Sequence, residues 1–385
     1  MITMDGYKGR QIACLFMTWL SYASTYLLRK PLGVVKADLA NVFHLSKTEL
    51  GFLDTALLLP YAFMQIMLSS LGDKYGPRVA LAGCLLGSAL SMTTIHCNDR
   101  QVKRFIISFA QVQLQSHFMQ DMRFIFLIPS VIVGSVGILV FLFLHSPSEL
   151  GISEASKTVG KMSSGSSPEP NQLTYSQLWK LKMVPELCWA SCCVKLVRYC
   201  MYMWLPMYLY QALNYSKYQA GYLSTVFEIG GVLGTAMLGF FVTRFLQGRA
   251  IYGVTLALFG STLFLALFQF TGTWGFAVNA VFMFLAGACN CGVDPYLTGS
   301  IPAEIGEREN AQAATAGLVN GFGGLGPIVE GPIVGWIADK YGWTGPFYLM
   351  VAMSLLGSVT MLKASKIDQS IKKAQFMGSL GSEDA

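Results

Sequence analysis

The stretch Ser46-Lys-Thr-Glu-Leu-Gly-Phe-Leu-Asp-Thr55 returns 170 residues later as Ser216-Lys-Tyr-Gln-Ala-Gly-Tyr-Leu-Ser-Thr225. The two stretches match at six of ten positions, five by identity and one by aromatic character. The glycine of each stretch is followed 22 residues later by Asp73 in the first copy and by Thr243 in the second. The chain therefore consists of two halves that repeat one pattern in the same order.

The composition is that of a protein embedded in a lipid bilayer. Of the 385 residues, 53% are hydrophobic and 12% are charged, whereas a soluble domain carries about 25% charged residues. The net charge of +6 comes without a basic block, so no nucleic-acid partner is expected. The nine cysteines are predicted to pack as small apolar side chains and not to form a disulfide framework or a metal site. No cofactor is expected.

Apolar runs predict the membrane helices, each of which needs about 20 such residues. Lys and Arg concentrate in the loops that would face the cytoplasm if both termini lie there. We therefore expect a multi-pass protein with cytoplasmic termini and ten spans, at residues 11–39, 50–71, 79–96, 124–145, 187–213, 220–245, 251–270, 276–301, 311–337 and 346–362.

A polar connector rich in Ser, Gly and Pro divides the runs and predicts a flexible cytoplasmic linker over residues 146–182. It separates a shortened first-half helical bundle (1–145) from a second-half bundle of six helices (183–364) and a cytoplasmic tail (365–385). Two parallel repeats joined in this way are typical of transporters whose substrate lies between the halves near the membrane midplane.

Arg198 is a charged residue near the middle of the run 187–213, where an unpaired charge costs about 3 kcal/mol on insertion scales. One interpretation is a structural ion pair with a buried acid such as Glu228. Lys195 lies three residues earlier on the same helix face, so one acid would not balance both cations. The other interpretation is therefore an anion site.

Arg29 and Lys30 hold the corresponding place in the first half, since Arg29 precedes Asp73 by 44 residues and Arg198 precedes Thr243 by 45. The two basic residues could instead extend to the membrane surface. If Arg29 and Arg198 face one central cavity, the two guanidinium groups suit a phosphate, which each can bind through two hydrogen bonds.

A charged loop follows the second apolar run, with the sequence Gly72-Asp-Lys-Tyr-Gly-Pro-Arg78. It is interpreted either as a conformational latch that joins neighbouring helix ends or as a charged tight turn. The second-half counterpart, residues 243–249, lacks the acid, so a weaker latch is expected there. The predicted latch residues are Gly72, Asp73, Lys74, Gly76 and Arg78.

These residues together resemble the organophosphate:phosphate antiporters of the major facilitator superfamily, which include glycerol-3-phosphate transporters and sugar phosphate exchangers. The resemblance rests on Tyr22-x3-Tyr26-x2-Arg29-Lys30, Tyr61, the loop 72–78, Lys195-Leu-Val-Arg198-Tyr199 and Phe227-Glu228-Ile-Gly-Gly231. Carried over residue by residue, it implies a substrate site made by Arg29, Arg198, Lys30, Lys195, Tyr22, Tyr26, Tyr61 and Glu228.

The resemblance also implies the fold and the activity. We expect an all-α major facilitator bundle that exchanges a phosphorylated sugar or polyol, of the glucose-6-phosphate or glycerol-3-phosphate class, for inorganic phosphate by alternating access. Its partners would be these two anions and the lipid bilayer, and it would not be an enzyme. The resemblance favours the endoplasmic reticulum membrane, with the plasma membrane or another internal membrane as alternatives. The oligomeric state is not indicated.

The chain departs from the family after residue 95, where a fourth and a fifth spanning helix should follow. Residues 96–122 contain no apolar run of the required length. A form without these helices is expected to insert with ten spans and to exchange phosphate poorly or not at all. Two alternatives therefore stay open: a truncated isoform without transport activity, and a proton-coupled symporter of a neutral solute with Asp54, Glu228 or Glu330 as proton carrier.

Overall fold

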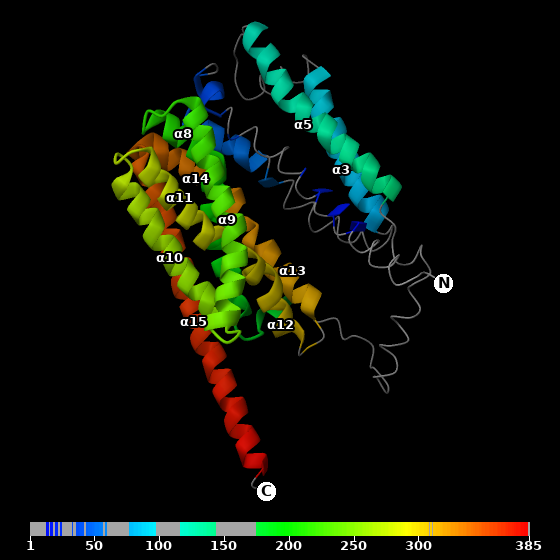
Figure 1. The fold of residues 1–385 in the computed structure, drawn as a ribbon, viewed down its shortest axis with the longest axis vertical. Helices are drawn as coiled ribbons and strands as arrows, with labels where there is room; N and C mark the ends of the chain where they lie inside the picture. Colours follow the sequence, from blue (N-terminus) through cyan, green and yellow to red (C-terminus); the bar gives the residue numbers. More distant parts are fainter. Residues whose placement is uncertain are drawn as a thin grey trace. The chain divides into compact units, whose positions relative to one another are not determined.

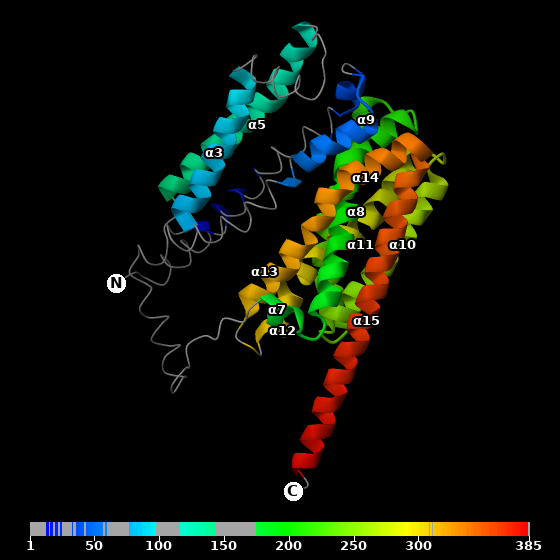
Figure 2. The ribbon, with the colours of Figure 1, turned by 180° about the vertical axis from the view of Figure 1, so that it is seen from behind.

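The computed structural model describes residues 77–97, 116–143, 175–307, 309 and 311–383, together with shorter pieces between residues 13 and 59. The regular elements in these ranges are helices (Figures 1 and 2). The chain forms two compact units. The first contains Met1–Leu45 and Phe63–Glu169, and the second contains Ser46–Ala62 and Pro170–Ala385. The start of the first repeat thus belongs to the second unit, and the domain bounds expected from the sequence stay a prediction.

The first unit contains two antiparallel helices, α3 (Pro77–Cys97) and α5 (Ser116–Phe143). At one end the Ser130 hydroxyl donates a hydrogen bond to the Ala89 carbonyl at 2.8 Å, and at the other the guanidinium of Arg78 donates to the Phe141 carbonyl at 2.7 Å. Between these contacts the buried side chains include Ala82, Leu85, Val133, Val136 and Val140.

The second unit contains the helices of the second half. Each apolar run predicted between residues 183 and 364 contains at least one of them, and α15 continues beyond the other helices of this unit (Figure 2). The elements are α7 (Tyr175–Trp179), α8 (Val184–Gln211), α9 (Lys217–Phe245), α10 (Ala250–Thr271), α11 (Phe276–Cys291), the π-helix η1 (Tyr296–Ser300), α12 (Ile301–Glu307), α13 (Gln312–Gly323), α14 (Leu325–Tyr341) and α15 (Thr344–Glu383).

The predicted linker is partly outside the described residues, which resume at Tyr175. Its last residues form α7 and a turn, where Leu178 is buried and the ring of Trp179 lies 5.3 Å from that of Phe322. The end of the predicted linker is therefore folded onto α13, because its apolar side chains find a surface to pack against.

Four helical stretches in the described ranges are long and apolar enough to cross a membrane: Lys217–Phe245, Ala250–Thr271, Phe276–Glu307 and Thr344–Ala374. Although α8 has 28 residues, it is not among them, and Lys195 and Arg198 lie in its interior. The predicted runs 11–39 and 50–71 lie largely outside the described residues. The expectation of ten spans is thus tested for only part of the chain.

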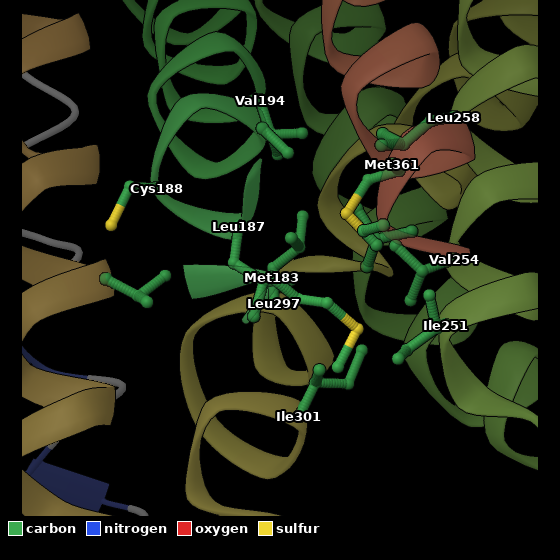
Figure 3. Close-up of a cluster of buried hydrophobic side chains, with 14 of the residues drawn as sticks. Met183, Leu187, Cys188, Val194, Ile251, Val254, Leu258, Leu297, Ile301 and Met361 are labelled. Atoms are coloured by element: carbon green, nitrogen blue, oxygen red, sulfur yellow. The ribbon is translucent and has the colours of Figure 1, made fainter. Parts of the chain in front are cut away.

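The core of the second unit includes apolar side chains of α8, α9, α10, α12, α13, α15 and η1 (Figure 3). Leu187, Val194 and Leu258 are fully or almost fully buried there, as is Cys188, which confirms the packing role predicted for this cysteine. Dispersion contacts of this kind stabilise helix packing inside lipid, where the hydrophobic effect between helices is absent.

Two helices cross so closely that glycine is required at the contact. A Cβ atom on Gly287 of α11 would lie 2.0 Å from the Phe227 carbonyl oxygen of α9. Small residues at such crossings let helix backbones approach each other in membranes. This contact fixes the part of α11 that leads to the candidate site.

The run 276–301 does not form one continuous helix. α11 ends at Cys291, and the chain turns at residues 292 and 293 before Pro295 precedes the π-helix η1. Proline has no N–H for the helical hydrogen bond, and π-turns occur frequently at functional sites. The break lies beside Asp294, the last residue before this proline.

The helical residues 47–56, 58 and 59, called the first-repeat helix, pack against α14 within the second unit. The Asp339 carboxylate accepts hydrogen bonds from the backbone N–H groups of Lys47 (3.1 Å) and Thr48 (2.9 Å) and from the Thr48 hydroxyl (2.7 Å). Asp339 lies beyond the apolar run 311–337. Its partial burial would raise the pKa, but these hydrogen bonds and the charge of Lys47 outweigh that effect and lower the pKa below its usual value.

Candidate functional site

Arg198 stands halfway along α8, with 14 helical residues before it and 13 after. Its guanidinium Nη1 donates a hydrogen bond to Asp294 Oδ2 at 2.9 Å, and each side chain is 21% exposed. Partial removal from solvent strengthens the attraction between such charges. The ion-pair partner of Arg198 is therefore Asp294 and not Glu228, the acid considered from the sequence.

Asp294 was missed in the sequence analysis, although a signal was present. It is the one acidic residue in the apolar run 276–301, and an ionisable residue at membrane depth is a candidate functional residue by default. Its backbone carbonyl accepts a hydrogen bond from the Thr298 hydroxyl at 2.8 Å. This contact lies in the π-turn that follows Pro295, so the irregular backbone helps to hold the carboxylate in place.

Lys195 has a partner on another helix. Its ammonium group donates hydrogen bonds to the backbone carbonyl of Asn320 at 3.2 Å and to the side-chain oxygen of the same residue, on α13. Asn320 is neutral, so the formal charges of Lys195, Arg198 and Asp294 sum to +1. Two cations three residues apart on α8, one of them bound to a neutral side chain, are a feature that an anion site uses.

Two further polar side chains of this region have atoms without hydrogen-bond partners in the described part of the chain. Asn290, four residues before Asp294, is fully buried, and neither of its amide atoms has a partner there. Glu228 of α9 is half-buried, and its Oε1 atom has none there. Buried polar atoms in native proteins are almost always paired, so these atoms are available to bind a polar ligand or water.

The first-half wall of the predicted site lies outside the described residues. This applies to the tyrosines, to the basic pair and to most of the latch loop, so the facing of Arg29 and Arg198 and the latch stay predictions. Of the predicted latch residues, Arg78 lies within the described residues, and its guanidinium lies 5.1 Å from the centre of the Phe141 ring. The residues outside the described ranges are Tyr22, Tyr26, Arg29, Lys30, Tyr61, Gly72, Asp73, Lys74 and Gly76.

An open hollow of about 550 Å³ lies at the C-terminal end of α8. Arg198 precedes Tyr210, a lining residue, by about 18 Å along the helix. The described residues that line it are uncharged, and none of them was predicted to bind substrate. The lining residues are Tyr210, Gln211, Asn214, Tyr215 and Trp343.

Two carboxylates predicted as alternative proton carriers are fully buried. Asp54 lies on the first-repeat helix and Glu330 on α14. A Cβ atom on Gly331 would lie 2.9 Å from the Asp54 Cβ, so both acids stand beside one helix crossing. They belong to a different part of the second unit from the α8–α11 contact.

Packed apolar helices, one of which has charged side chains at its centre, define a polytopic membrane protein. The chain belongs to the major facilitator superfamily, since the model of that family matches residues 14–111, 105–316 and 187–377. It is 24% identical to a putative glycerol-3-phosphate transporter 5 of Arabidopsis thaliana, over 94% of this chain and 92% of the other.

The chain is also similar to sugar phosphate exchangers, over shorter stretches. It is 25% identical to the glucose-6-phosphate exchanger SLC37A2 of Homo sapiens, over 62% of this chain and 54% of that protein. It is 33% identical to sugar phosphate exchanger 3 of Mus musculus, over 43% of this chain and 34% of that protein. The chain thus matches about half or less of the length of these two exchangers. The resemblance to organophosphate:phosphate antiporters is confirmed.

Proposed function

We propose that this protein exchanges a phosphorylated sugar or polyol for inorganic phosphate across a membrane, that of the endoplasmic reticulum, by alternating access. The cargo would be of the glucose-6-phosphate or glycerol-3-phosphate class. Relatives named as glycerol-3-phosphate transporters and glucose-6-phosphate exchangers support the class of cargo. Its binding site would contain Arg198 and Lys195 of the second half and Arg29 and Lys30 of the first.

The observation that carries the proposal is the position of the Arg198 guanidinium and its contacts. A partly exposed guanidinium stands halfway along a buried helix, three residues after the second cation Lys195, and contacts the Asp294 carboxylate. Arginine suits phosphate because its planar fork donates two parallel hydrogen bonds to phosphate oxygens. A purely structural ion pair would need no second cation.

Counter-flow of labelled phosphate into proteoliposomes loaded with different sugar phosphates tests the proposal. We expect uptake with phosphorylated cargo inside and none with free sugars. Arg198→Lys should reduce exchange at least about 100-fold, because an ammonium group cannot reproduce two-point binding. Arg249→Lys, at an exposed position after α9, is the matched control and should exchange normally. Unchanged exchange by Arg198→Lys would contradict the site.

The burial of Asp54 and Glu330 supports one other function, a proton-coupled symporter of a neutral solute. Buried carboxylates in transporters commonly carry protons. Such a carrier would accumulate solute in response to an imposed pH gradient, and Asp54→Asn would uncouple it. A phosphate exchanger would instead respond to the phosphate gradient with the pH held equal on both sides.

The shortened first half supports a third alternative, that this chain is a truncated form with little transport activity. The alignment with the Arabidopsis relative runs over 456 positions, more than the 385 residues of this chain, so part of that relative has no counterpart here. Exchange by this chain beside a version with a fourth and fifth helix inserted after residue 95 measures their contribution. Equal exchange by both would show that the arginine pair suffices in the smaller bundle.

A further inference from the structure

The two oxygens of the Asp294 carboxylate differ in their surroundings. Oδ2 accepts the hydrogen bond from Arg198 at 2.9 Å. Oδ1 is buried, and no residue in the described ranges donates a hydrogen bond to it. A buried acceptor without a donor destabilises the fold, so its presence in a native site calls for an explanation.

A group that binds Oδ1 must be a donor, because an ionised carboxylate can only accept hydrogen bonds. The acceptor lies beside the guanidinium that would attract an anion. An anion with a proton of its own supplies an O–H group to Oδ1, whereas an anion without one meets a second negative charge at close range. Inorganic phosphate keeps at least one P–OH group at neutral pH, and sulfate keeps none.

We propose that Asp294 makes this site selective for protonated tetrahedral anions, namely phosphate and singly ionised phosphate esters, over sulfate. In this arrangement Arg198 attracts the anion, Asp294 Oδ1 accepts the hydrogen bond from P–OH, and Oδ2 holds the guanidinium in position. The proposal rests on the proposed function, because it takes Arg198 as the residue that binds the phosphate group.

The test is competition against labelled phosphate uptake in phosphate-loaded proteoliposomes. For the wild-type chain we expect half-inhibition by sulfate to need at least about tenfold more anion than half-inhibition by unlabelled phosphate, the ratio one charge-assisted hydrogen bond supports. Asp294→Asn keeps an oxygen that can accept from Arg198 but can place an N–H donor toward the anion. The sulfate-to-phosphate ratio should then fall to near one.

Two further variants test whether the discrimination against sulfate comes from the Asp294 carboxylate itself or from the loss of any negative charge. Asp294→Glu restores a carboxylate and should recover part of the discrimination. Glu304→Gln removes an exposed carboxylate from α12 and should leave the ratio unchanged. A ratio that stays the same in Asp294→Asn overturns the proposal, and so does wild-type protein that sulfate inhibits as well as phosphate does.

Protection against thermal unfolding in detergent gives the same comparison without transport, since a bound anion raises the melting temperature. Phosphate should protect the wild-type chain more than sulfate does, and Asp294→Asn should lose that difference. Equal protection of the wild type by both anions overturns the selectivity of Asp294. Protection by phosphate without any exchange contradicts the proposed function and leaves the selectivity intact.

Discussion

The two copies of the sequence repeat begin two helices of the second unit in the same way. Ser46 and Glu49 form a reciprocal cap, in which the serine hydroxyl accepts from the Glu49 N–H at 3.2 Å and the carboxylate accepts from the Ser46 N–H at 2.8 Å. Ser216 and Gln219 form the same cap on α9, at 3.3 Å and 3.1 Å. Each cap satisfies two of the donors that a helix start leaves open.

Beyond the caps the two helices differ. The first-repeat helix also receives the Asp339 carboxylate of α14, and a Cβ atom on Gly51 would lie 2.1 Å from the Gly331 carbonyl oxygen. At the equivalent Gly221 of α9, no described atom lies within 4 Å of such a Cβ. The same local sequence thus serves a tight helix crossing in one copy and an open helix surface in the other.

The two helices should differ most in how much stability they lose when their equivalent glycines, Gly51 and Gly221, are replaced by alanine. Gly51→Ala would force the helices apart and should destabilise the protein by about 1–3 kcal/mol, the usual cost of overpacking. Gly221→Ala meets open space and should be neutral or stabilising by up to about 1 kcal/mol, because alanine favours helices over glycine. Melting temperatures in detergent measure both; equal effects would show that the two helices have equivalent surroundings.

The Asp339 contact gives the second prediction. Asp339→Ala removes the acceptor for two backbone N–H groups and the Thr48 hydroxyl, so the melting temperature in detergent should fall by an amount equivalent to about 2 kcal/mol. Asp368→Ala removes an acid that pairs with Lys372 on the exposed part of α15 and is the control. It should cost about 0.5 kcal/mol or less. A matching loss in both variants would contradict the helix-capping role of Asp339.

The third prediction concerns pH. The folded state lowers the pKa of Asp339 from 3.8, so its carboxylate contributes full stability above that value. The contribution is lost as the pH falls below 3.8 through the folded-state pKa. The difference in melting temperature between wild type and Asp339→Asn should therefore be constant from pH 7 to about pH 5 and shrink below about pH 4. A difference that grows on acidification would exclude this carboxylate as its source.

The smallest effects are expected at the cap serines. Ser216→Ala should cost about 1 kcal/mol, a usual value for the loss of an N-cap. Ser46→Ala should cost less, because Asp339 already accepts hydrogen bonds from two N–H groups of the same helix start. In an Asp339→Ala background the cost of Ser46→Ala should rise toward that of Ser216→Ala. Additive effects of Ser46→Ala and Asp339→Ala would show that the two caps act independently.

Much of the fold follows from local sequence. Apolar runs of sufficient length predicted the helices of the second half, because a chain in lipid must satisfy its backbone hydrogen bonds within each helix. The repeat predicted equivalent helix starts at Ser46 and Ser216. Arg198 and Lys195 were recognised because charge at membrane depth is costly and therefore has a function or a partner.

The partners themselves were decided by the tertiary structure. Nothing near Arg198 in the sequence indicates Asp294, 96 residues away, or separates it from Glu228 as the acid that the guanidinium contacts. In the same way the capping box of the first-repeat helix follows from Ser46 and Glu49, but Asp339 comes from a helix nearly 300 residues later. Hydrogen bonds within one turn follow from residue types and spacing, whereas a contact between distant helices depends on how the whole bundle packs.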